Sequence, residues 1–240
     1  MKIKLAGKNL EDIRVLLSRF GLEEDDNAFE MIICHGGDGA LLGAEREFPG
    51  ILKFPVRDAA TAPTCQKHLL EERLARLAAG AQKITELPKL AGTWQENRIF
   101  GINDIFIHNK VCCGALRYSV RIDGELYAKE IVGDGVGMAT VHGSTAYFRS
   151  ITRSVFRTGI GLAFSNAAAE VSHLVLPETS KVEIEILRGP GLIIADNSPV
   201  SEVAEGTKIT LQLSEEKAKV CGADEFMCPC CRKLRHRKEM

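Results

Sequence analysis

The sequence has no long apolar run, no excess of one charge, and no repeat or low-complexity stretch. No apolar run approaches the roughly 18 residues that a membrane span needs, so we expect neither a span nor a membrane partner. Lys and Arg total 31 against 32 for Asp and Glu, and so neutral a chain is not built around nucleic acid. The start, Met1–Ala6, lacks the apolar core of a secretion signal, so we expect a soluble, cytoplasmic protein.

The eight cysteines are distributed unevenly. Those in the body are Cys34, Cys65, Cys112 and Cys113. Without a secretion signal, we expect them to be reduced and mostly small core residues. Those in the tail are Cys221, Cys228, Cys230 and Cys231. Four thiols suit a tetrahedral Zn²⁺ site, but the tail lacks the usual two Cys-X-X-Cys pairs, so a solvated tail that includes the basic stretch 232–238 is the alternative.

The 240 residues suffice for one large domain or two small ones, and the first hundred alternate strand and helix patterns. Strands are predicted over Met1–Ala6, Ala28–Cys34 and Ile51–Phe54. Helices are predicted over Leu10–Phe20, with Asn9 as its cap, over Ala40–Glu47 and over Thr64–Ala79. Alternation of this kind indicates an α/β domain with a parallel sheet.

From residue 98 onward the apolar period is two, which predicts strands. Ala115–Ile122 and Glu125–Ile131 flank Asp123-Gly124, a strong hairpin signal. We therefore predict an α/β domain over residues 1–97, a β-rich domain over 98–218, and a Cys-rich basic tail over 219–240.

The first chemical motif, His35-Gly36-Gly37-Asp38-Gly39, follows a predicted strand. Ligands of open α/β sheets bind at that end, and glycines let the backbone approach a phosphate. Asp38 could accept a hydroxyl proton or help to hold a metal. The alternative is a glycine-rich turn in which Asp38 caps a helix.

Two later motifs also combine polar and small residues. Asn103-Asp104 enters an apolar strand, and an amide beside a carboxylate can bind ribose hydroxyls or a carboxamide. The segment 133–147 runs from Gly133-Asp134-Gly135 into Gly143-Ser144-Thr145-Ala146-Tyr147. Its small residues, hydroxyls and backbone N–H groups suit a phosphate or a base. The alternative for Asn103-Asp104 is a turn at the end of a strand, and the alternative for 133–147 is a glycine-rich loop and helix cap.

Taken in series, these motifs resemble the NAD kinase family over roughly residues 1–215. The family pattern is Gly-Gly-Asp-Gly, then Asn-Glu, then Asp-Gly-X-X-X-Ala-Thr-X-X-Gly-Ser-Thr-Ala-Tyr. The resemblance implies transfer of a phosphoryl group from ATP or polyphosphate to the 2′-hydroxyl of the adenosine ribose of NAD⁺. It also implies Mg²⁺ or another divalent cation, and a homodimer or homotetramer.

The resemblance assigns Asp38 as the catalytic carboxylate. The nucleotide-binding residues that it implies are Gly36, Gly37, Gly39, Asn103, Asp104, Asp134, Gly135, Thr145, Ala146, Tyr147 and Ser150. Among them, Asp134 corresponds to a contact on the nicotinamide side. Asp196-Asn197 lies near the place of a later Asp-Gly pair.

The chain departs from the family pattern at several places. Asp104 replaces the usual Glu, Ala40 replaces a Thr, and 54–60 replaces an Asn-X-Gly segment. Arg149, Arg153 and Arg157 would form one stripe on a helix, either a phosphate site or a solvated face. A kinase of the same fold with another hydroxyl acceptor, or a non-catalytic NAD(P)-binding protein, therefore stays open.

Overall fold

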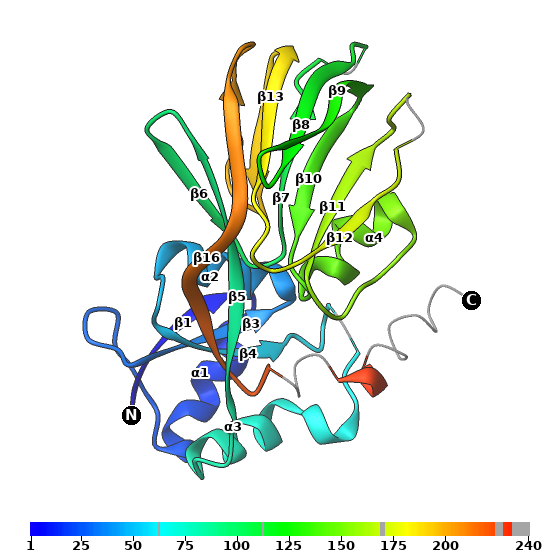
Figure 1. Ribbon diagram of the computed structural model, residues 1–240. Coiled ribbons are helices and arrows are strands. Elements are labelled where there is room, and N and C mark those ends of the chain that lie inside the picture. The colour runs from blue at the N-terminus through cyan, green and yellow to red at the C-terminus, as the bar shows by residue number, and fades with distance from the viewer. Residues whose placement is uncertain (62, 112, 169–170, 224–227, 232–240) are drawn as a thin grey trace. The chain divides into compact units, whose positions relative to one another are not determined.

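A computed structural model describes residues 1–61, 63–111, 113–168, 171–223 and 228–231 (Figure 1). The chain divides into two compact units, Met1–Leu87 with Ala218–Met240, and Pro88–Lys217. Cys112 and the basic stretch 232–238 lie outside the described residues. No helix within the described ranges is long and apolar enough to cross a membrane.

The first unit is built on a parallel sheet in the order β2-β1-β3-β4-β16. Its strands are β1 (Lys2–Gly7), β2 (Glu23–Glu24), β3 (Met31–Gly36), β4 (Leu52–Arg57) and the end of β16 (Lys208–Cys221). Its helices are α1 (Glu11–Leu17), α2 (Asp38–Glu47) and α3 (Leu70–Ala78). The parallel α/β layer predicted from the alternating pattern is confirmed.

Helices cover both faces of this sheet. Ile13 of α1 and Leu74 of α3 pack with Phe54 of β4 in one buried cluster. Ala44 of α2 packs with Ile32 and Cys34 of β3 in another, on the opposite face of the strand. Because both faces are buried, β3 reads as the continuous apolar run Met31–Cys34 rather than as an alternation.

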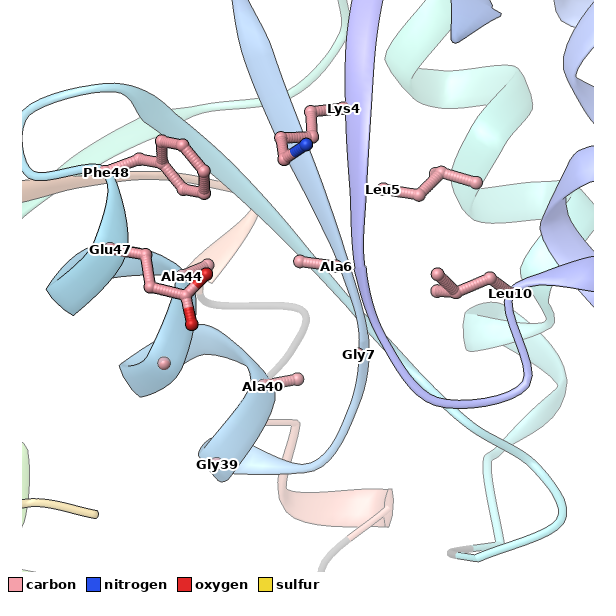
Figure 2. Close-up of a pocket in the computed structure, with 11 residues that line it drawn as sticks. Lys4, Leu5, Ala6, Gly7, Leu10, Gly39, Ala40, Ala44, Glu47 and Phe48 are labelled. Atoms are coloured by element: carbon pink, nitrogen blue, oxygen red, sulfur yellow. The ribbon is translucent and has the colours of Figure 1, made fainter. Parts of the chain in front are cut away.

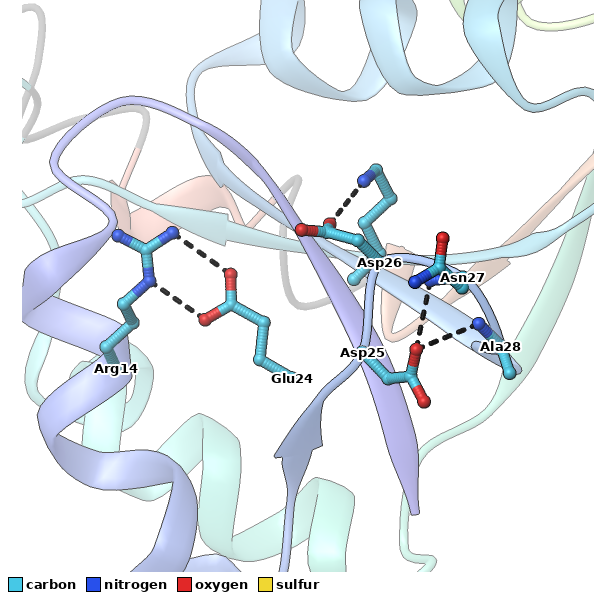
Figure 3. Close-up of polar contacts among 7 residues, drawn as sticks. Arg14, Glu24, Asp25, Asp26, Asn27 and Ala28 are labelled. Atoms are coloured by element: carbon cyan, nitrogen blue, oxygen red, sulfur yellow. Dashed lines mark hydrogen bonds and ion pairs between the residues drawn. The ribbon is translucent and has the colours of Figure 1, made fainter.

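The loop between β2 and β3 is closed by its own polar groups, as Figure 3 shows. The backbone N–H groups of Asn27 and Ala28 donate to Asp25 over 2.9 and 3.0 Å. A hydrogen bond from the Lys2 ammonium, with these N–H groups, lowers the pKa of Asp25 to about 2. Nearby, Arg14 of α1 donates two hydrogen bonds to Glu24 over 2.8 and 3.0 Å.

The second unit holds two antiparallel sheets, confirming the predicted β-rich half. One contains the first part of β16, β13 (Val182–Arg188), β8 (Leu116–Ile122) and β9 (Glu125–Gly133), with β5 (Ile84–Trp94) and β6 (Asn97–Gly101). The other has the order β12 (Leu174–Leu176), β11 (Ile160–Ser165), β10 (Gly135–Ala139), β7 (Asp104–Asn109), β14 (Gly191–Ala195), β15 (Ser201–Val203). The helix α4 (Tyr147–Thr152) follows a 3-10 turn at Gly143–Thr145.

Alternate residues of both sheets form a shared core in this unit. Tyr118 and Val120 of β8 and Ile107 of β7 are fully buried there. The Tyr118 hydroxyl donates to the carbonyl oxygen of Gly135 over 3.1 Å, so the two sheets are also joined by a polar contact. The predicted hairpin at Asp123-Gly124 is present, with φ of 52° and 86°, which is the conformation that this dipeptide favours.

Some boundaries differ from those predicted. The division falls at Leu87 rather than near residue 97, and the described part of 218–240 belongs to the first unit rather than standing apart. The predicted helix 64–79 begins at Leu70, after a 3-10 turn at Gln66–His68. Asn9 does not cap α1, because its side-chain amide donates to Asp58 instead. Of the body cysteines, Cys34 is buried as predicted, whereas Cys113 is exposed.

A buried ion pair joins α2 to β4 in the first unit. Lys53 of β4 donates to Glu45 of α2 and to the carbonyl oxygen of Phe48. The side chains of Lys53 and Glu45 are only 0% and 5% exposed. Removing one member would leave the other charge buried without its counter-charge, which costs far more than losing a surface ion pair.

We therefore expect Glu45→Gln to lower the free energy of unfolding by about 3 kcal/mol. Glu47→Gln, which changes an exposed residue of the same helix, should alter it by less than about 0.5 kcal/mol. Urea unfolding followed by circular dichroism measures both variants. Equal stability of the two would show that the pair does not hold α2 on the sheet.

Candidate functional site

In the first unit, the Gly-Gly-Asp-Gly motif turns from β3 into α2. Gly36 has φ of 146°, a conformation that glycine adopts far more readily than other residues. Asp38 is the first residue of α2, with Gly37 as the cap, so Asp38 is not a side-chain cap. Its side chain is 53% exposed and accepts a hydrogen bond from the buried guanidinium of Arg57 over 3.3 Å. The carboxylate is therefore held by a cation while still open to a ligand.

The neighbouring strand ends at the same edge of the parallel sheet. Asp58 follows β4 and is 1% exposed. Burial favours its neutral form, but hydrogen bonds from the Ala60 N–H and the Asn9 amide lower the pKa of Asp58 overall. Nδ1 of His35 donates a hydrogen bond to the carbonyl oxygen of Lys8 over 2.7 Å. These contacts hold the ends of β1, β3 and β4 around the glycine turn.

A pocket of about 320 Å³ adjoins this turn (Figure 2). Gly39 and Ala40 of α2 and Ala6 and Gly7 of β1 line it, and their small side chains leave the space open. Lys4 and Glu47 also line the pocket, and the Lys4 ammonium forms an ion pair with Asp26. The wall therefore carries both signs of charge beside the glycine turn.

In the second unit, the start of β7 is held by one carboxylate. Asp196 follows β14, and its two oxygens accept the backbone N–H groups of Ile102, Asn103 and Asp104 over 2.8, 2.7 and 3.2 Å. The Asp196 N–H in turn donates to the carbonyl oxygen of Asp104 over 3.0 Å. This double connection places the Asn103-Asp104 pair.

The third motif reaches the same place through close backbone packing. The N–H of Thr140 donates to the carbonyl oxygen of Asn103 over 2.8 Å, and its hydroxyl donates to that of Ile102 over 2.6 Å. A Cβ on Gly143 would lie 1.9 Å from the Asn103 oxygen, so only glycine fits. The structure therefore brings the second and third motifs together.

Asp104 is a buried carboxyl group, 8% exposed. Burial, followed by the charge of Asp196, raises its pKa to about 7, while the backbone N–H of Tyr147 donates to it and acts in the opposite direction. Near neutral pH this group can therefore act as either a hydrogen-bond donor or an acceptor.

A row of aromatic rings continues from Asp104 along the same face of β7. Phe106 and His108 stack with centroids 5.8 Å apart, and the Tyr147 ring lies 4.8 and 5.4 Å from them. Burial lowers the pKa of His108, opposed by the charge of Asp134. Asp134 in turn accepts a hydrogen bond from the Asn166 amide over 2.6 Å. The row of rings thus lies between two carboxyl groups, Asp104 and Asp134, with Phe106 buried and Tyr147 partly exposed.

The remaining predicted residues line a pocket of about 410 Å³ beside α4. Its walls are Thr145, Ala146, Arg149, Ser150 and Arg153. The predicted helical stripe of three arginines is wrong, because α4 ends at Thr152 and Arg153 has φ of 57°. The chain must turn there for Phe156 to pack on Phe148, with centroids 5.0 Å apart. Arg149 and Arg153 nevertheless share one pocket, where they can neutralise phosphate oxygens.

The sequence does not reveal the roles of Arg57 and Asp58. Both lie in the segment 54–60, which departs from the family pattern, and nothing in the sequence links Arg57 to Asp38. Asp196 did carry a signal, since Asp-Asn after the apolar run Leu192–Ala195 favours a turn with positive φ. The tail cysteines are divided: Cys228 and Cys231 lie with Cys65 and His68, whereas Cys221 packs in the core and Cys230 is exposed.

We expect Gly143→Ala to destabilise the second unit by about 2 kcal/mol or more, because the new methyl group would collide with the Asn103 carbonyl. The matched control is Gly114→Ala, whose Cβ would meet its nearest neighbour at an ordinary 3.6 Å. Urea unfolding followed by the fluorescence of Trp94, the single tryptophan and a core residue of this unit, compares them. Similar midpoints would contradict the close packing.

Asp104 should make the stability of the second unit fall as pH rises. Its pKa is about 7 in the folded protein and about 3.9 in an unfolded chain, so between these values only the folded form keeps the proton. Relative to Asp104→Asn, the wild type should lose about 3 kcal/mol between pH 5 and pH 8. Trp94 fluorescence in urea at both pH values measures the difference. A constant difference would mean that Asp104 titrates normally.

No protein-family model matches the chain. It is 33% identical over 150 residues to an NAD kinase of Clostridium perfringens, covering 58% of this chain and 53% of that protein. The match thus spans about half the length of that relative. This chain is also 27% identical over 244 residues to an NAD kinase of Sulfurisphaera tokodaii, and that match covers 92% of this chain and 94% of the relative.

Two solved structures share the fold. One is yeast NADH kinase complexed with NADH, at a TM-score of 0.80 and 16% identity, covering 94% of this chain and 84% of the other. The other is an NAD kinase from Archaeoglobus fulgidus in complex with ATP, at a TM-score of 0.77 and 19% identity. That match covers 95% of this chain and 96% of the other. The chain is thus similar in sequence to proteins named NAD kinase, and it shares its fold with solved NAD and NADH kinases.

Proposed function

We propose that the protein is an NAD kinase, which transfers a phosphoryl group from ATP or polyphosphate to the 2′-hydroxyl of the adenosine ribose of NAD⁺. The observation that carries the proposal is the joined Asn103-Asp104 and Gly143–Tyr147 segments, beside an arginine-lined pocket. Relatives named NAD kinase, and neighbours that hold NADH or ATP, support it.

Asp38 is the proposed catalytic base. A ribose hydroxyl is a weak nucleophile, and a positioned carboxylate that accepts its proton contributes about 10²- to 10⁴-fold in rate. Arg57 orients Asp38 through the 3.3 Å contact, and the half-exposed carboxylate remains accessible to a hydroxyl group. Gly36, Gly37 and Gly39 let the backbone approach the phosphates of a bound nucleotide.

In this proposal, residues of the second unit bind the dinucleotide. Asn103 and Asp104 would bind ribose hydroxyls, and their positions are fixed by Asp196. Asp134 and Gly135, at the far end of the aromatic row, would contact the nicotinamide side. Thr145, Ala146, Tyr147 and Ser150 would border the dinucleotide, with Arg149 and Arg153 beside its phosphates.

A divalent cation, Mg²⁺ in our proposal, would neutralise phosphate charge when bound. Kinases commonly hold Mg²⁺ through one or two carboxylates and the phosphates of the substrate. The half-exposed Asp38 fits that role as a single carboxylate ligand. Asp12, His35 and Asp58 also place ligand atoms within 4.8 Å of one another, but an imidazole suits Mg²⁺ poorly. A cytoplasmic homodimer or homotetramer completes the proposal.

The first test is NADP⁺ formation from NAD⁺, ATP and Mg²⁺, measured through an NADP-specific dehydrogenase. We expect Asp38→Asn to lower kcat by about 10²- to 10⁴-fold while NAD⁺ binding persists. The matched control is Asp26→Asn, which alters an exposed carboxylate of the same unit, 69% exposed, and should leave kcat within about twofold.

The outcomes separate the activity from the residue. Equal turnover by wild type and Asp38→Asn would keep the kinase and reject Asp38 as its base. No turnover with ATP or polyphosphate, in protein that binds NAD⁺, would reject the proposed reaction. It would favour another hydroxyl acceptor or a non-catalytic NAD(P)-binding protein.

A further inference from the structure

Four side chains of metal-binding types, none of them assigned a role above, converge in the first unit. The ligand atoms of Cys65, His68, Cys228 and Cys231 all lie within 4.8 Å of one another. Nδ1 of His68 is 3.1 Å from the sulfur of Cys65 and 3.4 Å from that of Cys231. Cys65 and His68 belong to the segment between β4 and α3, and the other two to the C-terminal segment.

These separations match the ligand shell of one small cation. Zinc bonds of about 2.3 Å to sulfur and about 2.0 Å to nitrogen, in a tetrahedron, place S and N about 3.5 Å apart and two sulfurs about 3.8 Å apart. The observed sulfur-to-nitrogen distances of 3.1 and 3.4 Å lie just below the first value. Three thiols and one imidazole make a closed four-ligand set, which is typical of structural zinc.

The backbone around the sulfurs is arranged as it is in metal-binding turns. The ligands form two short pairs, Cys65-X-X-His68 and Cys228-X-X-Cys231. In the first pair, the N–H of Lys67 donates to the Cys65 sulfur. In the second, the N–H groups of Cys230 and Cys231 donate to the Cys228 sulfur. The N–H of Cys65 also donates to the Cys231 sulfur over 3.4 Å. Such donors stabilise thiolates, the form that binds metals.

We propose that Cys65, His68, Cys228 and Cys231 bind one structural Zn²⁺ ion, which ties the C-terminal segment to the loop between β4 and α3. The set differs from the one suggested by the tail alone, because Cys221 packs with Leu77 and Phe54 in the core and Cys230 is exposed. The site is independent of the proposed kinase activity. The loop that it fixes begins next to Arg57, the partner of Asp38.

The test uses full-length protein purified under reducing conditions without a histidine tag. Elemental analysis should find one zinc per chain. After removal of the metal with a chelator, Co²⁺ should restore one equivalent and give the visible bands of a tetrahedral site with sulfur ligands. Cys228→Ser and His68→Ala should bind almost none, whereas the matched control Cys230→Ser should bind as much as wild type.

Alkylation of the wild type avoids variants that fail to fold. With the metal bound, Cys65, Cys228 and Cys231 should resist iodoacetamide, whereas the exposed Cys113 and Cys230 should react. Chelation should expose the protected three. Absence of stoichiometric metal after reconstitution, equal loss in Cys230→Ser, or a disulfide between Cys65 and Cys231 would each overturn the proposal.

Discussion

The arrangement of the second unit depends on one carboxylate accepting hydrogen bonds from three consecutive backbone N–H groups. Asp196 fixes residues 102–104 at the point where the chain enters β7. Without such a partner, these donors would be buried at a strand end with no hydrogen bond, which is costly. The same contact brings a second carboxylate next to Asp104, which is a reason for the raised pKa of that group.

The two units stabilise their carboxyl groups in opposite ways. In the first, Lys53 and Glu45 neutralise each other, and Arg57 supplies the counter-charge for Asp38. In the second, Asp104 is buried beside Asp196, and its raised pKa lets it hold a proton near neutral pH. The first arrangement pairs each carboxylate with a cation, and the second lets a carboxyl group donate a hydrogen bond. Both states suit the binding of hydroxyl groups and phosphates that we propose for this protein.

Much of the fold could be predicted because it depends on local patterns of apolar and turn-forming residues. Buried strands such as Met31–Cys34 show continuous apolar runs, and Asp123-Gly124 specifies its turn by backbone preference alone. Boundaries were less predictable. The helix expected over 64–79 starts late because Leu69 is extended, and the arginine stripe ends where Phe156 turns back to pack on Phe148. Packing between distant residues overrides helical spacing in such places.

The sequence by itself determined the alternation of elements and the motifs that resemble the NAD kinases, since turn chemistry and apolar period act between near neighbours. Only the tertiary structure decided which distant groups meet. It joined Arg57 to Asp38, Asp196 to Asp104, and Cys65 and His68 to Cys228 and Cys231. These partners lie up to 166 residues apart, and their distance is set by strand order and register, which no local pattern encodes.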